Sequence, residues 1–345
     1  MNQTAVALDA DYRALSRRRV GWLVCWLAII AASLLVDFTT GPSAMRLAEV
    51  WQALCHRGDL TGQIVVWDIR LPAALLAVCV GMALGLAGAE MQTVLDNPLA
   101  SPFTLGLSAA AALGASLGIV LQTSLPGVSG AWLVPVNAFV FALMSALLLE
   151  LVGRVARLSG MVMFGIALGF SCSALLSLVQ FAASAEALQS MVFWTMGSLS
   201  RAAWGPIGLL VVALALLMPW AWHNSWRLTA LRLGEDRAVS FGVDVRRLRR
   251  GALLRISLLA GLAVAFAGTI GFIGLVAPHL ARSLFGEDHR YYLPASALIG
   301  GAVLSWASLA SKSLLPGVVI PVGIVTALVG VPFFMLVIFR QARRA

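Results

Sequence analysis

The chain has 345 residues, of which 60% are hydrophobic and only 11% are charged, and its mean hydropathy is +0.93. A soluble domain carries about 25% charged residues, so this composition excludes an ordinary water-facing surface. The net charge of +9 does not indicate nucleic-acid binding, because arginines gathered on the cytoplasmic side of a membrane protein give the same excess. We therefore expect an all-α, polytopic membrane protein, embedded in a lipid bilayer and binding no nucleic acid.

The first apolar segment, in SRRRVGWLVCWLAIIAAS, resembles a signal peptide. Its apolar run from Val20 to Val36 is long and further spans follow, so we interpret it as an uncleaved helix. A bilayer core about 30 Å thick requires roughly 20 helical residues. The predicted spans are 20–38, 71–94, 103–122, 131–152, 161–183, 204–222, 251–268, 271–285, 292–311 and 321–339. The eighth is short and contains Pro278, so other helices must cover its ends.

The arginines indicate the orientation of these ten spans. With the N-terminus inside, most of the 24 basic residues fall in cytoplasmic segments, as the positive-inside rule requires. Residues 1–19 are then a cytoplasmic tail, both termini are cytoplasmic, and residues 1–345 form one transmembrane domain. The basic residues left outside are Arg46, Arg57, Arg70, Arg201 and Lys312.

Glycines recur at four-residue spacing within three of the predicted spans. This spacing lets helix backbones approach closely, so it predicts a tight bundle. The pairs are Gly81 with Gly85, Gly114 with Gly118, and Gly165 with Gly169.

The spans contain few titratable side chains, and none forms a recognisable catalytic or metal-binding motif. Glu150 and Arg154 have the spacing of a helical ion pair at the membrane interface. Glu90 lies one turn before the loop LDNPLASP, where we expect it to snorkel or form a hydrogen bond; a functional acid is the alternative. His279 is interpreted as a packing residue, and Lys312 lacks the glycines of a phosphate-binding loop. We expect no catalytic residue, no metal and no cofactor.

The stretch LRLGEDRAVSFGVDVRRLRRG, residues 231–251, is densely charged by contrast. Glu235 and Asp236 favour the N-terminus of a short helix, Gly242 can end it, and Asp244 can cap the next one. Solvated positive-inside arginines are the simpler interpretation of this loop. It does not explain Val239 and Phe241 on an ordered helix–turn–helix, which suits docking of a soluble partner.

Six motifs between about Arg70 and Phe334 resemble the permease subunits of ATP-binding-cassette (ABC) importers for iron-siderophores, haem and vitamin B12. In chain order they are RLPAALLAVCVGMALGLAGAEMQ, DNPLASPFTLGLSAAAALGA, VFWTMGSLSRA, LGEDRAVSFGVDV, GTIGFIGLVAPHLARSLFGEDHRYYLPASALIGG and PVGIVTALVGVPFF. The fifth is the most specific.

The resemblance implies ten helices, a second permease (identical or paralogous), two ATPase subunits and a periplasmic binding protein, in a bacterial inner membrane. It implies that the segment of about 228–250 couples to the ATPase, through Leu233, Gly234, Glu235, Asp236, Arg237, Ala238, Phe241, Gly242 and Val243. It gives structural roles to Asn97, Pro98, Gly271, Pro278, His279, Arg282, Pro321 and Gly323, and makes Arg57 and Lys312 candidates for docking the binding protein.

The chain departs from the family pattern on its outer side. Val319 and Ile320 stand where many relatives have a glutamate, and Ser308 and Lys312 stand where relatives often have Asp and Arg. These changes affect the expected docking geometry more than the fold. The resulting hypothesis is ATP-driven import of a ferric siderophore, with haem or a corrinoid as alternative cargo. An ion-coupled secondary transporter using Glu90 is the alternative from another class.

Overall fold

The computed structural model describes residues 3–40, 45–57, 59–121, 130–155, 158–315 and 317–342. Every named element in these residues is a helix. The first seven helices and one π-helical turn are α1 (Gln3–Thr39), α2 (Leu47–Leu54), α3 (Leu60–Ile64), η1 (Val65–Arg70), α4 (Leu71–Val94), α5 (Leu107–Leu121), α6 (Gly130–Val155) and α7 (Leu158–Ala182). The remaining helices are α8 (Ala185–Thr195), α9 (Trp204–His223), α10 (Ser225–Leu231), α11 (Glu235–Ser240), α12 (Val245–Ala267), α13 (Ile273–Phe285), α14 (His289–Ser313) and α15 (Val322–Ala342).

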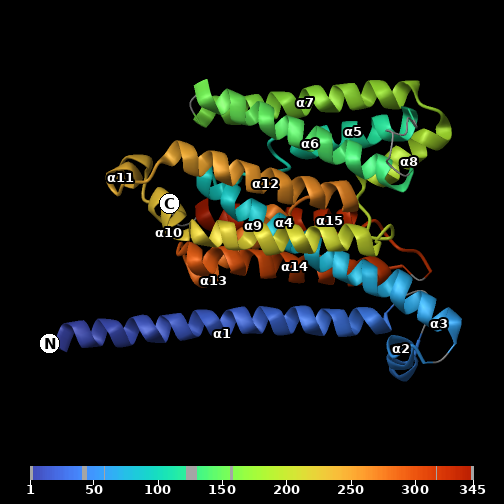
Figure 1. Ribbon diagram of the computed structural model, residues 1–345, viewed down its shortest axis with the longest axis horizontal. Coiled ribbons are helices and arrows are strands. Elements are labelled where there is room, and N and C mark those ends of the chain that lie inside the picture. The colour runs from blue at the N-terminus through green and yellow to red at the C-terminus, as the bar shows by residue number, and fades with distance from the viewer. Residues whose placement is uncertain are drawn as a thin grey trace.

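The long helices run side by side along the longest axis of the molecule (Figure 1). α7 forms one edge of the view and α1 the opposite edge, with α4, α9, α12 and α14 between them. α10 and α11 lie at the same end as the beginning of α1, while α2, α3 and α8 lie at the other end. The short helices thus sit at the two ends of a bundle of long ones.

The prediction of about ten apolar helices is confirmed within the described residues. Seven are long and apolar enough to cross a bilayer, and three shorter apolar helices, Leu107–Leu121, Ile273–Phe285 and Val322–Leu336, complete the set. The predicted third span, 103–122, begins too early: turns occupy the residues before Leu107, and Gly106 has a φ of +79°. The predicted seventh span, 251–268, begins too late, because α12 starts at Val245 and includes the arginines before Gly251. Helices α2, α3, α8 and α10 were not predicted.

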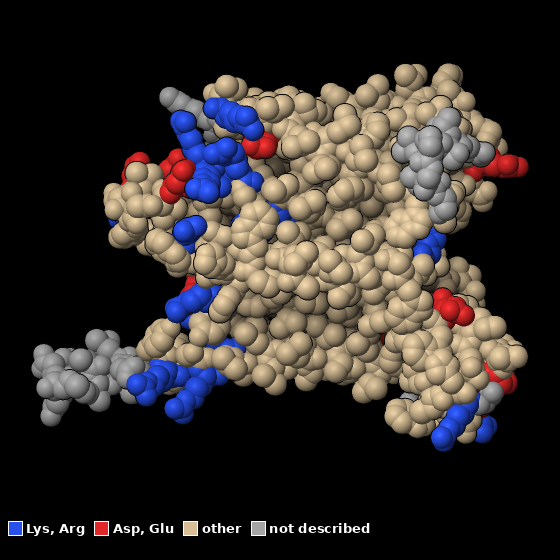
Figure 2. Space-filling view, in the orientation of Figure 1, with Lys and Arg blue, Asp and Glu red and all other residues tan. Residues whose placement is uncertain are grey.

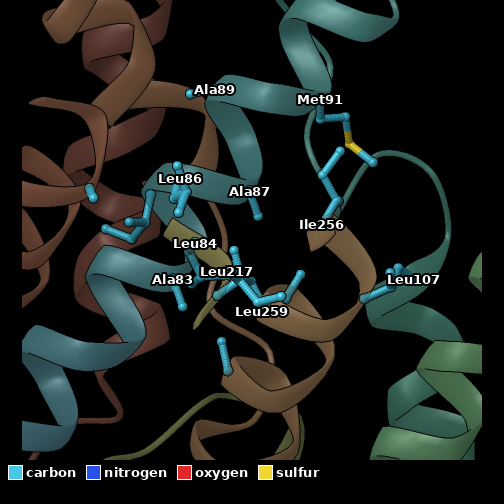
Figure 3. Packing of buried hydrophobic residues seen from close by; sticks show 14 of the residues in the cluster. Ala83, Leu84, Leu86, Ala87, Ala89, Met91, Leu107, Leu217, Ile256 and Leu259 are labelled. Carbon is cyan, nitrogen blue, oxygen red and sulfur yellow. The ribbon is translucent and has the colours of Figure 1, made fainter. Parts of the chain in front are cut away.

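The core is centred on α4, which packs against α14, α12 and α13. The prediction of close approach at Gly81 and Gly85 is confirmed: a Cβ at Gly81 would collide with the carbonyl group of Gly300, and one at Gly85 with that of Ser296. Figure 3 shows the alanines and leucines of α4 packed with Leu217 of α9 and Leu259 of α12. Small residues therefore bring the backbones together, and dispersion contacts hold them there.

Candidate functional site

The segment between α9 and α12 folds into two short helices joined by glycine turns. α10 ends at Leu231, and the chain turns through Gly234, which has a φ of +109°. α11 begins with Glu235 and Asp236, and Gly242, with a φ of +79°, redirects the chain after it. Side chains rarely adopt such φ values, which explains glycine at both corners. Asp244 then caps α12, its carboxylate accepting a hydrogen bond from the backbone N–H of Arg247 (2.9 Å). The predicted helix–turn–helix is confirmed.

The surface of α11 and its two turns combines anchors with exposed apolar groups. Ala238 and Val243 are buried and are joined by a backbone hydrogen bond from Val243 to Ala238 (3.0 Å). Leu233, Val239 and Phe241 are 53%, 58% and 59% exposed, an unusual exposure for apolar side chains beside charged ones. Figure 2 shows arginines gathered at this end of the molecule, over the ends of α6 and α12, while the middle of the visible face carries almost no charge. We call residues 233–243 the coupling surface, after the role that the sequence resemblance predicts for them.

Two charged contacts hold the coupling surface to the long helices on one side. Glu235 accepts a hydrogen bond from Arg249 of α12 (2.8 Å). Arg249 also donates to the backbone carbonyl of Val94, the last residue of α4 (3.2 Å). One guanidinium therefore joins α11, α12 and the end of α4.

Arg232 makes a second connection on the other side of the same segment. It donates to the Glu287 carboxylate with two nitrogens (3.2 Å each) and to Asp96 in the loop after α4 (2.7 Å). Burial alone would lower the pKa of Arg232, but Glu287 and Asp96 outweigh it and raise that pKa above its ordinary value. Glu287 also pairs with Arg282 of α13 (3.1 Å). The turn before α11 is thereby fixed to the α13–α14 corner.

His289 is a residue that the sequence did not reveal as part of this site. Its side chain is fully buried, with Nε2 lying 2.8 Å from the hydroxyl of Thr93 in α4 and Nδ1 3.1 Å from that of Thr229 in α10. The backbone N–H of His289 also donates to Thr229 (3.1 Å). A lone histidine carries no signal in the sequence, because its two partners lie far from it along the chain. It joins α4, α10 and α14.

The residues that the resemblance marked as structural shape the loops around this connection. Asn97 accepts a hydrogen bond from the backbone N–H of Leu99 (2.9 Å), and Pro98 lies inside that turn. Arg282 donates to Gln92 (3.3 Å) and to the hydroxyl of Tyr292 (3.2 Å). These contacts order the α4–α5 loop and the corner that holds Arg232.

The remaining marked residues lie in α13 or in the loops and helix that flank it, before α13 and at the start of α15. Gly271 is in the loop before α13, Pro278 is buried within that helix, and the His279 ring meets Phe333 edge-on (6.2 Å). Pro321 directly precedes α15. A Cβ at Gly323 would collide with the carbonyl oxygen of Met196, so glycine permits the contact between α15 and the end of α8. The packing interpretation of His279 agrees with this geometry.

Glu90 does not snorkel to the interface, contrary to expectation. Its side chain is fully buried, and its carboxylate accepts hydrogen bonds from the Nε (3.0 and 3.1 Å) and a terminal nitrogen of Arg255 in α12, which is 1% exposed. The indole ring of Trp220 covers the guanidinium at 4.8 Å. An isolated charge in a bilayer is costly, and pairing with Arg255 offsets part of that cost. The predicted Glu150–Arg154 pair is present at 2.9 Å.

The two candidate docking residues for a binding protein differ in their environments. Arg57 is exposed in the loop after α2, at the end of the molecule opposite the coupling surface. Lys312 is held by Asp37 of α1, with both carboxylate oxygens 2.8 Å from its Nζ, and its side chain is only 13% exposed. Its ammonium group therefore already has a partner within the chain. The docking role of both residues stays a prediction.

Comparison with known proteins gives consistent matches along nearly the whole chain. The model of the FecCD transport family matches residues 28–340. The hemin transport system permease HmuU of Yersinia pestis is 36% identical over 95% of this chain and 97% of its own. The vitamin B12 import permease BtuC of Salmonella typhi is 34% identical over 96% and 98%.

A solved structure described as an inward-facing conformation of a putative metal-chelate type ABC transporter superposes with a TM-score of 0.83. It is 29% identical and the match covers 93% of this chain and 99% of the other. These matches include the glycine contacts of α4 and the coupling surface described above. The chain belongs to the FecCD transport family, as a non-catalytic, multi-pass membrane permease subunit of an ABC importer whose ATP is hydrolysed by a separate subunit.

Proposed function

We propose that this chain forms the pathway for a ferric siderophore across a bacterial inner membrane, with both termini on the cytoplasmic side. The permease would pair with a second copy or a paralogue, take its energy from two ATPase subunits, and receive its cargo from a periplasmic binding protein. Hemin, vitamin B12 and the metal chelate of the relatives' names share one chemistry: a metal held inside a large organic ligand. That shared chemistry supports cargo of this size and kind.

The observation that carries the proposal is the coupling surface: exposed Leu233, Val239 and Phe241 on a segment that charged contacts fix to α4, α12 and the α13–α14 corner. A soluble ATPase subunit would bury these apolar groups, and its ATP-driven movement would reach α4 through Arg249 and Arg232. The pathway then opens alternately to either side, because the ATPase contacts the two states differently.

A groove of about 480 Å³ supports passage of a bulky cargo. It lies where α8 ends and α13 and α15 begin, and no Asp, Glu, Lys, Arg or His stands among the described residues that line it. Uncharged walls let a large ligand pass without binding it tightly, as translocation requires. Its lining includes Thr104, Thr195, Met196, Phe272, Ala327 and Leu328.

Ion-coupled transport is the weaker alternative. It would require Glu90 to release and take up a proton or sodium ion, yet Glu90 is fully buried and bound to Arg255. A carboxylate committed to an internal ion pair has no free face for a coupling ion. Uptake into right-side-out vesicles that depends on ATP inside them and not on an ion gradient would support ATP-driven import over ion coupling.

The cargo is tested by deleting the gene and measuring uptake of a labelled ferric siderophore, with haem and cobalamin in parallel. Loss of siderophore uptake alone, restored by the intact gene, supports the proposal. Loss of haem or cobalamin uptake with siderophore uptake intact replaces the cargo and keeps the importer. Before the three substrates are compared, paralogous importers are deleted so that redundancy does not mask the result.

The coupling surface is tested with Phe241→Asp, because Phe241 is exposed and its replacement leaves the fold of the chain intact. We expect ATPase association to weaken at least about tenfold, since an aromatic anchor that the ATPase subunit would bury is replaced by a charge. Leu60→Asp is the matched control: Leu60 is 76% exposed on α3 at the opposite end of the molecule. Equal association of both variants would refute the assignment of the surface.

A further inference from the structure

A second feature of the cytoplasmic end is a pocket of about 830 Å³ enclosed by α6, α9, α10 and α12. It adjoins the coupling surface at Gly242, and most of its lining comes from α9, α10 and α12. We call it the Trp–Arg pocket, from the residues that dominate its lining: Trp220, Trp226, Arg227, Arg247, Arg250 and Leu254.

The pocket has positive charge that the chain does not neutralise. Within the described part of the chain, the guanidinium groups of Arg247 and Arg250 form no ion pair and no hydrogen bond, and both residues are exposed. Of the two acids in the lining, Glu150 pairs with Arg154 (2.9 Å), whereas Asp244 caps α12 and keeps its negative charge, which is outnumbered by the arginines. Arg227 donates to the side-chain oxygen of Asn224 (3.0 Å) and keeps its charge. An anion would find two unpartnered guanidinium groups here.

The pocket also lies at the depth of the lipid headgroups. Trp220 and Trp226 are 39% and 52% exposed at the cytoplasmic end of α9 and on α10, and tryptophan is enriched at that level of a bilayer. Leu254 lines the pocket and is 44% exposed. Leu216, one turn before Trp220 on α9, is 67% exposed, so the wall continues toward the membrane centre as an apolar surface. On the side of the arginines that faces the membrane centre, the pocket therefore continues as an apolar surface that acyl chains can contact.

We propose that the Trp–Arg pocket binds an anionic phospholipid, one per chain. Its phosphate diester would lie between Arg247 and Arg250, since guanidinium groups match phosphate oxygens in geometry and charge. The acyl chains would lie along Leu254 and Leu216. Basic pockets between membrane helices on the cytoplasmic side have the form that such headgroups require. A free phosphate would use the arginines but leave the apolar wall exposed, so the two parts together specify a lipid.

The test compares the wild-type full-length chain with the double variant Arg247→Gln/Arg250→Gln. Each protein is purified in mild detergent together with the subunits that stay bound to it. Phosphatidylglycerol or phosphatidylcholine is added, and retained lipid is counted by native mass spectrometry. We expect one tightly retained phosphatidylglycerol per chain, and an affinity about 30-fold weaker in the variant, from two lost guanidinium–phosphate attractions. Arg17→Gln/Arg18→Gln, which removes the same charge from exposed positions on α1, is the control and should retain the lipid.

Two further measurements separate the lipid from other anions. Leu254→Gln should weaken phosphatidylglycerol retention several-fold while leaving the binding of glycerophosphoglycerol, the deacylated headgroup, unchanged. Glycerophosphoglycerol should compete poorly with the intact lipid. The proposal is overturned if the headgroup alone competes as well as the lipid, if both arginine variants lose lipid equally, or if phosphatidylcholine is retained as strongly as phosphatidylglycerol.

Discussion

Helices α4 and α7 are equally hydrophobic and occupy opposite environments. The most apolar stretch of each has a mean hydropathy of 2.1, yet 72% of that stretch is buried in the span containing α4 and 11% in the span containing α7. α4 carries Gly81, Gly85 and Gly88 at the contacts with its neighbours, whereas α7 exposes Phe170 and Phe181. Hydropathy therefore identifies a span without showing which span lies inside. Glycine spacing alone does not show it either, because Gly165 and Gly169 of α7 have the same spacing and lie against Leu105 and Gly106 before α5.

The physical reason is that the surrounding lipid is as apolar as a leucine side chain. Burying a large apolar residue between helices gains little over leaving it in lipid, so close packing and polar contacts decide which helix occupies the centre. α4 also contains a buried acid, Glu90, which only a helix at the centre of the bundle can pair with Arg255. α7 contains no Asp, Glu, Lys or Arg.

We expect the largest loss of stability when the buried acid of α4 is neutralised. Glu90→Gln leaves Arg255 charged and unpaired inside the bundle, and we expect a loss of about 3–5 kcal/mol in stability, measured as a fall in the thermal midpoint of the purified protein. Glu150→Gln, which removes a partly exposed acid from an ion pair on α6, should cost less than about 1 kcal/mol.

A second variant allows the ion pair to be tested even if Glu90→Gln does not accumulate in cells. Glu90→Gln/Arg255→Met removes both charges and should recover much of the lost stability. If the single variant were as stable as the wild type, the ion pair would have no role in holding α4 and α12 together.

Truncation of one large side chain in each helix sharpens the contrast. Leu86→Ala removes atoms from a fully buried site in α4 and leaves a cavity, so we expect a loss of about 2–4 kcal/mol. Phe170 is 73% exposed in α7, and Phe170→Ala should change stability by less than about 0.5 kcal/mol. A large effect at Phe170 would instead show that α7 is covered by protein in the assembled importer, as an interface with the second permease would require.

A single added methyl group tests the glycine contacts of α4. Gly88→Ala would bring a Cβ into the backbone of Gly274 in α13, and we expect a loss of about 1–3 kcal/mol as the helices separate. Gly208 in α9 has no atom near the position of an added Cβ, so Gly208→Ala should be neutral or slightly stabilising. The two changes are chemically identical, and equal thermal midpoints would mean that the helices yield at Gly88 without cost.

The sequence predicted these spans because each apolar run is a local property. It also predicted the turn at Gly242 and the cap at Asp244, since both depend on residues within one turn of helix. The partners of Glu90, Arg232 and His289 could not be predicted, because each pairing joins segments distant along the chain. Nothing in the sequence near a polar residue identifies such a distant partner. Glu90 was therefore placed at the interface when it is buried. Helix α8 was missed for a related reason: it is too short to register as a span.

Helix α1 offers the smallest and last test, because only 17% of its apolar stretch is buried, close to the value for α7. Unlike α7, it is held in its N-terminal half by Arg19, which donates to Asp288 (3.3 Å), and by Ser16, which bonds Tyr291 (2.7 Å). Burial alone would raise the pKa of Asp288, but hydrogen bonds from Arg290 and the charge of Arg19 outweigh it, so that pKa lies below its ordinary value of 3.8.

Because the pKa of Asp288 is lower in the folded state, its stabilising contribution is complete above about pH 4 and is lost as the pH falls through the folded value. Asp288→Asn should therefore reduce the free energy of unfolding by less than about 1 kcal/mol, seen as a slightly lower thermal midpoint. The reduction should be the same from pH 7 to about pH 5. The difference from wild type should shrink below about pH 4, where the wild-type carboxyl also becomes neutral. A difference that grew on acidification would mean that the carboxyl holds α1 in its protonated form, and that packing, as in α7, accounts for the rest of its attachment.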